Sequence, residues 1–168
     1  MLTFKKLGFR WLLLVLALSW VSSPLAMAQT EPADRYAKSS LPVVYLSQNW
    51  SSSESLEFYS LRQGSPLMHR EIFDCLEPVS GAGLFRDAEN MTKYGFLSQR
   101  PHALNPEGYP IGFVAESAIE MNCSACHTSR FTFGGKEYRV DGSQAMTDVE
   151  SFLRDLAQAM QDTFKFKL

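Results

Sequence analysis

Two stretches of the chain combine a polar start signal with apolar residues at helical spacing. The first opens with Ser51-x-x-Glu54, a capping box, and runs through Tyr59. The second opens with Thr147-x-x-Glu150, the same signal. It is followed by an apolar stripe at Val149, Phe152, Leu153, Leu156 and Met160. We therefore predict an amphipathic helix after each signal.

A third helix is predicted over residues 66–77. Pro66 suits the first position of a helix, and Pro78 suits the residue after its end. Apolar residues recur between them at helical spacing, at Met68, Ile72, Phe73 and Leu76.

Strand signals are few. Gly134-Gly135 divides the two strand-like runs of residues 131–140 and predicts a hairpin, and residues 41–46 favour a short extended segment. Residues 79–112 are rich in Gly, Pro and Asn, so we expect loops around one short helix near 87–94. The pattern as a whole predicts a mainly α, loop-rich domain with a small β-hairpin.

The amino terminus has the features of an export signal. Basic residues precede an apolar run at 11–21, and Ala26-Met27-Ala28 provides a cleavage site before Gln29. The run is too short to span a bilayer, although an uncleaved anchor remains the alternative. We expect a signal peptide at 1–28, a flexible lead-in at 29–45 and one further domain at 46–168. The protein is expected to be periplasmic or secreted, with no stable membrane span after cleavage.

Composition excludes several classes. The 168 residues include 16 Lys and Arg, 18 Asp and Glu, and 45% hydrophobic residues, which is ordinary for a globular protein. Without residues 1–28 the net charge becomes −5, because three basic residues are lost and no acidic ones. A basic nucleic-acid-binding protein is therefore not expected.

One motif carries chemistry. Cys123-Ser124-Ala125-Cys126-His127 has the spacing at which two thiols add to the vinyl groups of haem and the histidine becomes the proximal iron ligand. The alternatives are a thiol redox pair, a structural zinc site or a plain disulfide. No βαβ pattern or second ligand pair accompanies the motif. We predict one haem c attached through Cys123 and Cys126, and therefore a cytochrome c-like haem domain at 46–168.

Other candidates are weaker. Cys75 falls on the apolar face of the predicted 66–77 helix and is expected to be a buried, unreactive thiol. His69 is expected at the surface, and His102 in a loop. Met146 and Met160 follow the motif, but neither is expected to bind the iron strongly. Four arginines are candidates to neutralise haem propionates, with ordinary surface charge as the alternative: Arg86, Arg100, Arg130 and Arg139.

The order of several motifs resembles a known family. They are Leu46-Ser-Gln-Asn-Trp50, Leu84-Phe85-Arg86, Leu104-Asn105-Pro106-Glu107-Gly108, the Cys123–Thr128 motif and Val140-Asp141-Gly142. They are similar to the amino-terminal part of the di-haem c-type cytochromes that include bacterial rubber oxygenase, distant relatives of di-haem cytochrome c peroxidases. The resemblance implies two covalent haems and a distal side left free on the first. This chain lacks the second haem motif, so we read it as a fragmentary member.

Two functions follow. The first is electron transfer by an exported c-type cytochrome with one haem and a redox partner protein. The second is the amino-terminal domain of a di-haem oxygenase or peroxidase, which a second haem domain would have to complete.

Overall fold

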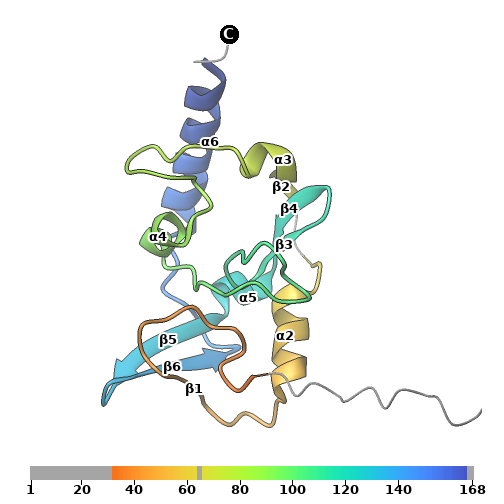
Figure 1. Cartoon of the computed structure of the whole chain (residues 1–168), viewed down its shortest axis with the longest axis vertical. Coiled ribbons are helices and arrows are strands. Elements are labelled where there is room, and N and C mark those ends of the chain that lie inside the picture. Colours follow the sequence, from red (N-terminus) through yellow and green to blue (C-terminus); the bar gives the residue numbers. More distant parts are fainter. Residues whose placement is uncertain (1–31, 64–65, 166–168) are drawn as a thin grey trace, which may run out of the picture. The chain divides into compact units, whose positions relative to one another are not determined.

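The computed structural model describes residues 32–63 and 66–165. By its contacts the chain divides into two units, Met1–Thr30 and Glu31–Leu168, and every described residue belongs to the second. The predicted signal peptide lies outside the described residues. The elements follow in the order shown in Figure 1: β1 (Val43–Tyr45), α2 (Ser52–Ser60), β2 (Pro66–His69), α3 (Arg70–Phe73), α4 (Ala88–Met91), η1 (Thr92–Tyr94), β3 (Phe113–Ala115), β4 (Ala118–Met121), α5 (Cys123–Cys126), β5 (Thr128–Phe133), β6 (Lys136–Asp141) and α6 (Val149–Lys165).

The first sheet has the strand order β1-β6-β5. Strands β5 and β6 form an antiparallel hairpin from Thr128↔Asp141 to Phe133↔Lys136. Its turn is Gly134-Gly135, and both glycines have positive φ, a conformation that most other residues adopt only at a cost. Strand β1 adds to β6 in parallel. The predicted hairpin and the predicted extended segment are both confirmed.

The second sheet, β2-β4-β3, is antiparallel and was not predicted. Its strands β3 and β4 form a hairpin around Glu116-Ser117, and β2 joins β4 from a distant part of the chain. Two three-stranded sheets make the fold mixed α/β. The prediction of a mainly α, cytochrome c-like domain is therefore wrong.

The predicted 66–77 helix accounts for part of this error. Its first third is strand β2, and only the single turn α3 is helical. Pro66 is compatible with β2 because β2 lies at the edge of its sheet, where an absent N–H breaks no internal ladder bond. Pairing with β4, about fifty residues away, decides the conformation, and a local helical spacing cannot reveal that pairing.

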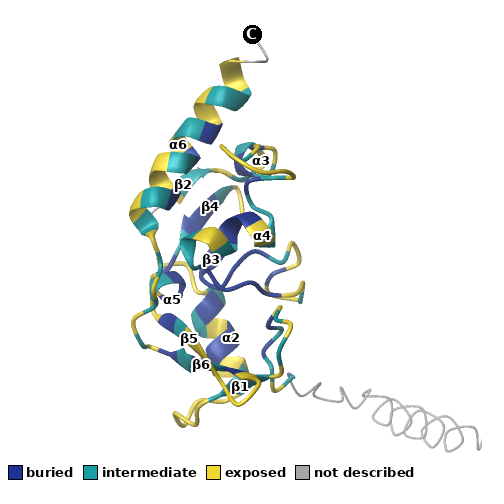
Figure 2. Ribbon diagram, turned by 90° about the vertical axis from the view of Figure 1, so that its left-hand side faces the viewer, coloured by how far each residue is buried: buried dark blue, intermediate teal, exposed yellow. Residues whose placement is uncertain are grey.

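The other predicted helices are present. In α2, Ser51 accepts a bond from the Glu54 amide while the Glu54 carboxylate accepts one from the Ser51 amide at 2.7 Å, a complete capping box. In α6 the cap is Asp148 rather than Thr147, because Asp148 Oδ1 accepts the Ser151 amide at 2.9 Å. Figure 2 shows buried and exposed positions interspersed along α6. The short helix expected near 87–94 is α4 followed by η1.

The main core is aromatic and packs α6 against residues that precede it in the chain. Phe152 of α6 lies 5.1 Å from Phe96, 5.7 Å from Phe113 and 5.8 Å from Phe85, measured between ring centroids. Such tilted and edge-to-face pairs add to the stability gained from apolar burial. Ala125 of α5 belongs to the same core, so the core holds the turn that carries the two cysteines.

The predicted flexible lead-in, 29–45, is packed where it is described. Arg35 is buried and forms an ion pair with Asp141, Ala37 forms a bridge with Gln99, and β1 belongs to the first sheet. These contacts join the segment to the rest of the second unit. Across the described ranges, no helix has the length and apolar character needed to cross a membrane.

The inner face of β6 is charged. Glu137, Arg139 and Asp141 are buried, whereas the alternating Tyr138 and Val140 stay partly exposed. Together with Arg35, these three residues form what we call the charged cluster. Alternation of polar and apolar residues normally places the apolar side of a strand in the core. In β6 the charged side chains are buried instead, and the apolar ones face outward.

Candidate haem-attachment site

The Cys-x-x-Cys motif lies on the single helical turn α5. Asn122 caps this turn: its side-chain oxygen accepts the Ser124 amide at 2.9 Å and the Ser124 hydroxyl at 2.7 Å. At the other end, the His127 amide donates to the Cys123 carbonyl at 2.9 Å. The turn thereby brings both cysteines and the histidine onto one short, capped element.

Asn122 also fixes the turn to α2. Its amide nitrogen donates to the carbonyls of Phe58, Tyr59 and Leu61, at 3.3, 3.2 and 2.8 Å. These carbonyls lie at the end of α2, where a helix leaves acceptors unsatisfied. A single buried side chain therefore caps the carboxyl end of α2 and the amino end of α5.

Gly112 allows the turn to pack closely. Its φ is +80°, and a Cβ placed there would lie 2.2 Å from the Ala125 nitrogen. The Gly112 carbonyl accepts the Asn122 amide at 2.8 Å. Any larger residue at 112 would push α5 away from the core.

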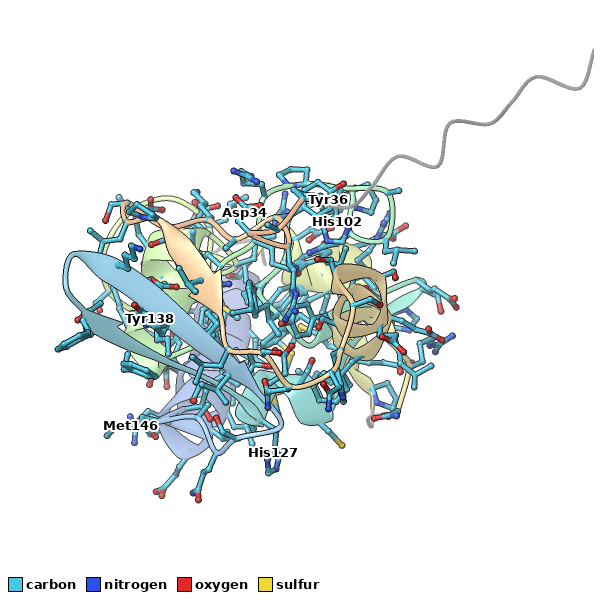
Figure 3. All side chains as sticks on the ribbon, turned by 90° about the horizontal axis from the view of Figure 1, so that it is seen from below. Asp34, Tyr36, His102, His127, Tyr138 and Met146 are labelled. Atoms are coloured by element: carbon cyan, nitrogen blue, oxygen red, sulfur yellow. The ribbon has the colours of Figure 1, made fainter. Side chains whose placement is uncertain are left out.

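The turn has a buried side and an accessible side. Ser124 and Ala125 are buried, whereas Cys123 is exposed, Cys126 is half-buried, and His127 is exposed. All three cysteines of the described chain are free. In Figure 3 the His127 ring lies at the lower edge of the protein and points outward. The two thiols and the imidazole are therefore the accessible groups, and these are the groups that react with or bind a haem.

The loop after β6 runs beside the motif. The Gly142 amide donates to the His127 carbonyl at 2.7 Å, and the Ala145 amide donates to the Cys126 carbonyl at 2.8 Å. An open hollow of about 550 Å³ is lined by residues 144–148. Met146 in this loop is 98% exposed, and Figure 3 shows it on the same lower side as His127.

These residues fit a covalently attached haem. Thioether bonds need two reduced, accessible thiols one helical turn apart, and the axial position needs a histidine beside them. Cys123, Cys126 and His127 meet these requirements, because both thiols are free and the histidine is exposed.

The predictions of a metal-binding protein and of a cytochrome-type domain need correction. In the described ranges, no group of three or more His, Cys, Asp or Glu side chains could hold a metal ion. The described side chains therefore include no cage of ligands such as a structural zinc site has. The mixed α/β fold removes the structural argument for a cytochrome-type domain. Among the described residues, only the attachment motif supports haem.

The weaker cysteine and histidine candidates lie elsewhere. Cys75 is exposed, so the prediction of a buried thiol is wrong; the predicted helix that placed it inward does not form. His69 is exposed, as expected. His102 stacks on Tyr36 with ring centroids 4.5 Å apart, and Figure 3 shows this pair at the edge opposite His127. Met160, on α6, is 37% exposed rather than a filled core position.

The four arginines proposed for propionates all face carboxylates of the protein. Arg86 approaches Asp74 at 3.3 Å, and Arg100 binds Asp34 at 2.8 Å. Arg139 is buried against Glu137 at 2.7 Å, and Arg130 lies 3.9 Å from the same carboxylate. Each of the four therefore has a carboxylate of the fold within 4 Å, and Arg130 and Arg139 share the carboxylate of Glu137.

The sequence reasoning missed Asn122 and Gly112. Asn is a favoured N-cap residue, so an Asn directly before the first cysteine is a signal that was available. The role of Gly112 depends on α5 packing against a distant loop, and the sequence carries no local sign of it.

Comparisons with known proteins give little guidance on function. No protein-family model matches the chain, and no solved structure matches it significantly. Among curated proteins it is similar to an uncharacterized protein, y4iJ, of Sinorhizobium fredii, at 26% identity over 66% of this chain. This chain spans 22% of the length of that relative.

Proposed function

We propose that this chain is an exported electron-transfer protein carrying one haem c, bound through Cys123 and Cys126 with His127 as axial ligand. The observation that carries the proposal is a capped Cys-x-x-Cys-His turn with free thiols and an exposed histidine. The export signal at 1–28 supports it, because haem of this type is attached outside the cytoplasm.

The protein's own residues hold and present the group. Asn122 and Gly112 fix the backbone of α5, so the two thiols keep their spacing before attachment. When bound, haem supplies a one-electron couple. Because the motif faces solvent, the edge of the attached group would stay within reach of a redox partner protein.

Haem staining of the denatured protein tests the proposal. The chain is produced in an exporting host that contains haem-attachment machinery, and the processed protein is expected to begin at Gln29. The wild-type band is expected to stain, and staining is expected to disappear in Cys123→Ala/Cys126→Ala.

Cys75→Ala is the matched control, since Cys75 is also exposed and free but lies outside the motif. It should stain like the wild type. A folded wild-type protein that does not stain, or equal loss of staining in Cys75→Ala, contradicts the proposal.

The second candidate is the amino-terminal haem domain of a di-haem oxygenase or peroxidase. The match covers 22% of y4iJ, and a longer protein of that kind would have room for the second haem domain that this candidate requires. Its partner would be a second haem domain.

Binding of carbon monoxide to the reduced protein distinguishes the two candidate functions. An oxygenase or peroxidase domain needs an open sixth position, so its reduced form should bind carbon monoxide rapidly. The exposed Met146 side chain is not packed toward any partner, and Met146→Ala is expected to leave that binding unchanged. A reduced spectrum indifferent to carbon monoxide, made responsive by Met146→Ala, would favour the electron carrier.

A further inference from the structure

The first sheet has an outer face that is apolar and largely uncovered. Because β6 turns its charged side inward, its partly exposed side chains Tyr138 and Val140 lie on the outer face. The register places Phe131 opposite Tyr138, and the two rings stack with centroids 5.2 Å apart. This arrangement is unusual, since an antiparallel sheet normally presents its polar face to water.

The exposure of this face increases toward the turn of the hairpin. Phe131 is 48% exposed and Phe133 is 74% exposed. A Cβ added at Gly134 or Gly135 would have no neighbour within 4 Å, so the turn stands clear of the other described elements. We call Phe131, Phe133, Lys136 and Tyr138 the aromatic arm.

Charge at the arm has one sign. Lys136 is exposed and lies opposite Phe133 on the same face, whereas Arg130, opposite Arg139 on the inner face, lies 3.9 Å from the Glu137 carboxylate. The hairpin's two acids, Glu137 and Asp141, are buried on the inner face. An otherwise acidic chain therefore presents a basic, aromatic projection.

The arm is separate from the haem-attachment motif. Phe133 is six residues beyond His127 along β5, which at strand geometry is roughly 20 Å. A group attached at Cys123 and Cys126 therefore leaves the end of the hairpin uncovered.

We infer that the aromatic arm docks the protein on an anionic lipid surface. Aromatic rings flanked by Lys or Arg favour the headgroup region, where rings enter the apolar boundary and cations meet lipid phosphates. The inference does not depend on haem binding.

Co-sedimentation with lipid vesicles tests the inference on the processed chain. Vesicles of phosphatidylglycerol mixed with phosphatidylcholine are compared with phosphatidylcholine alone. The wild type is expected to bind the anionic vesicles and to be released by salt. Lys136→Gln should weaken binding roughly five-fold, and Phe133→Ser roughly ten-fold.

Phe164→Ser and Lys38→Gln are the matched controls, because both residues are exposed but lie outside the hairpin. They should bind like the wild type, and unchanged circular dichroism verifies that each variant is folded. Absence of wild-type binding to anionic vesicles would overturn the inference and point to a protein partner. Equal losses in Phe164→Ser and Phe133→Ser would also overturn it, by showing unspecific adsorption.

Discussion

Replacing Asp141 by Asn tests the role of the charged cluster in joining β6 to α2 and the lead-in. The Asp141 carboxylate is buried and accepts bonds from Arg35 Nη1 at 2.7 Å, from the Ser55 hydroxyl at 2.8 Å, and from the Tyr59 hydroxyl. Burial, together with the nearby Asp141 carboxylate, raises the pKa of Tyr59, so Tyr59 remains a donor at neutral pH. Asparagine preserves the shape but removes the charge.

The expected loss of stability arises because the substitution leaves the buried Arg35 without its counter-ion. Arg35 also stacks over the Tyr45 ring at 3.8 Å and is nearly inaccessible, so its charge would lose its buried counter-ion. Breaking a buried pair from one side typically costs about 3–5 kcal/mol. Because a domain of this size is stable by about 5–15 kcal/mol, the change should be large but measurable.

Urea unfolding followed by circular dichroism measures the free energy of unfolding. Asp141→Asn is expected to lower it by about 3–5 kcal/mol. Arg35→Met combined with Asp141→Asn should cost clearly less than the sum of the two single changes, because the double variant buries no unpaired charge. A loss below about 1 kcal/mol for Asp141→Asn, or strict additivity in the double variant, would refute the reasoning.

Two further predictions concern Gly112 and Asp148. Gly112→Ala should lower the free energy of unfolding by about 2–3 kcal/mol, whereas Gly134→Ala, which meets no neighbour, should cost about 1 kcal/mol; equal losses would contradict the close packing against α5. The bond from the Ser151 amide holds the pKa of Asp148 below its ordinary value, so its carboxylate stabilises α6 above about pH 4 and that contribution is lost as the pH falls further. Asp148→Asn should flatten this part of the stability–pH profile, and an unchanged profile would show that the cap is not formed.

The sequence predicted those elements whose signals are local. The Ser51–Glu54 capping box, the Gly134-Gly135 turn and the apolar stripe of α6 each act within a few residues. Strand β2 was missed because its conformation depends on pairing with β4. The β3–β4 hairpin did leave a signal, two apolar runs around Glu116-Ser117, that could have been used.

The sequence pattern could not predict which face of β6 is buried. Alternation of residue types shows that a strand has two different faces, but it does not show which of them faces the core. Here the buried face is the charged one, because Arg35, Ser55 and Tyr59 from distant segments donate to Asp141, and Arg139 Nε donates to Glu137. The candidate site was easier to find, since its three residues are contiguous, but the supporting contacts of Asn122 and Gly112 required the fold.

The most direct test of the central claim is the mass of the peptide that contains Cys123 to His127, taken from protein exported in the presence of haem-attachment machinery. The account predicts a peptide carrying one haem bonded to both cysteines, while the peptide containing Cys75 is unmodified. A folded protein whose motif peptide has only its polypeptide mass, or that mass less two hydrogens from a Cys123–Cys126 disulfide, would contradict it.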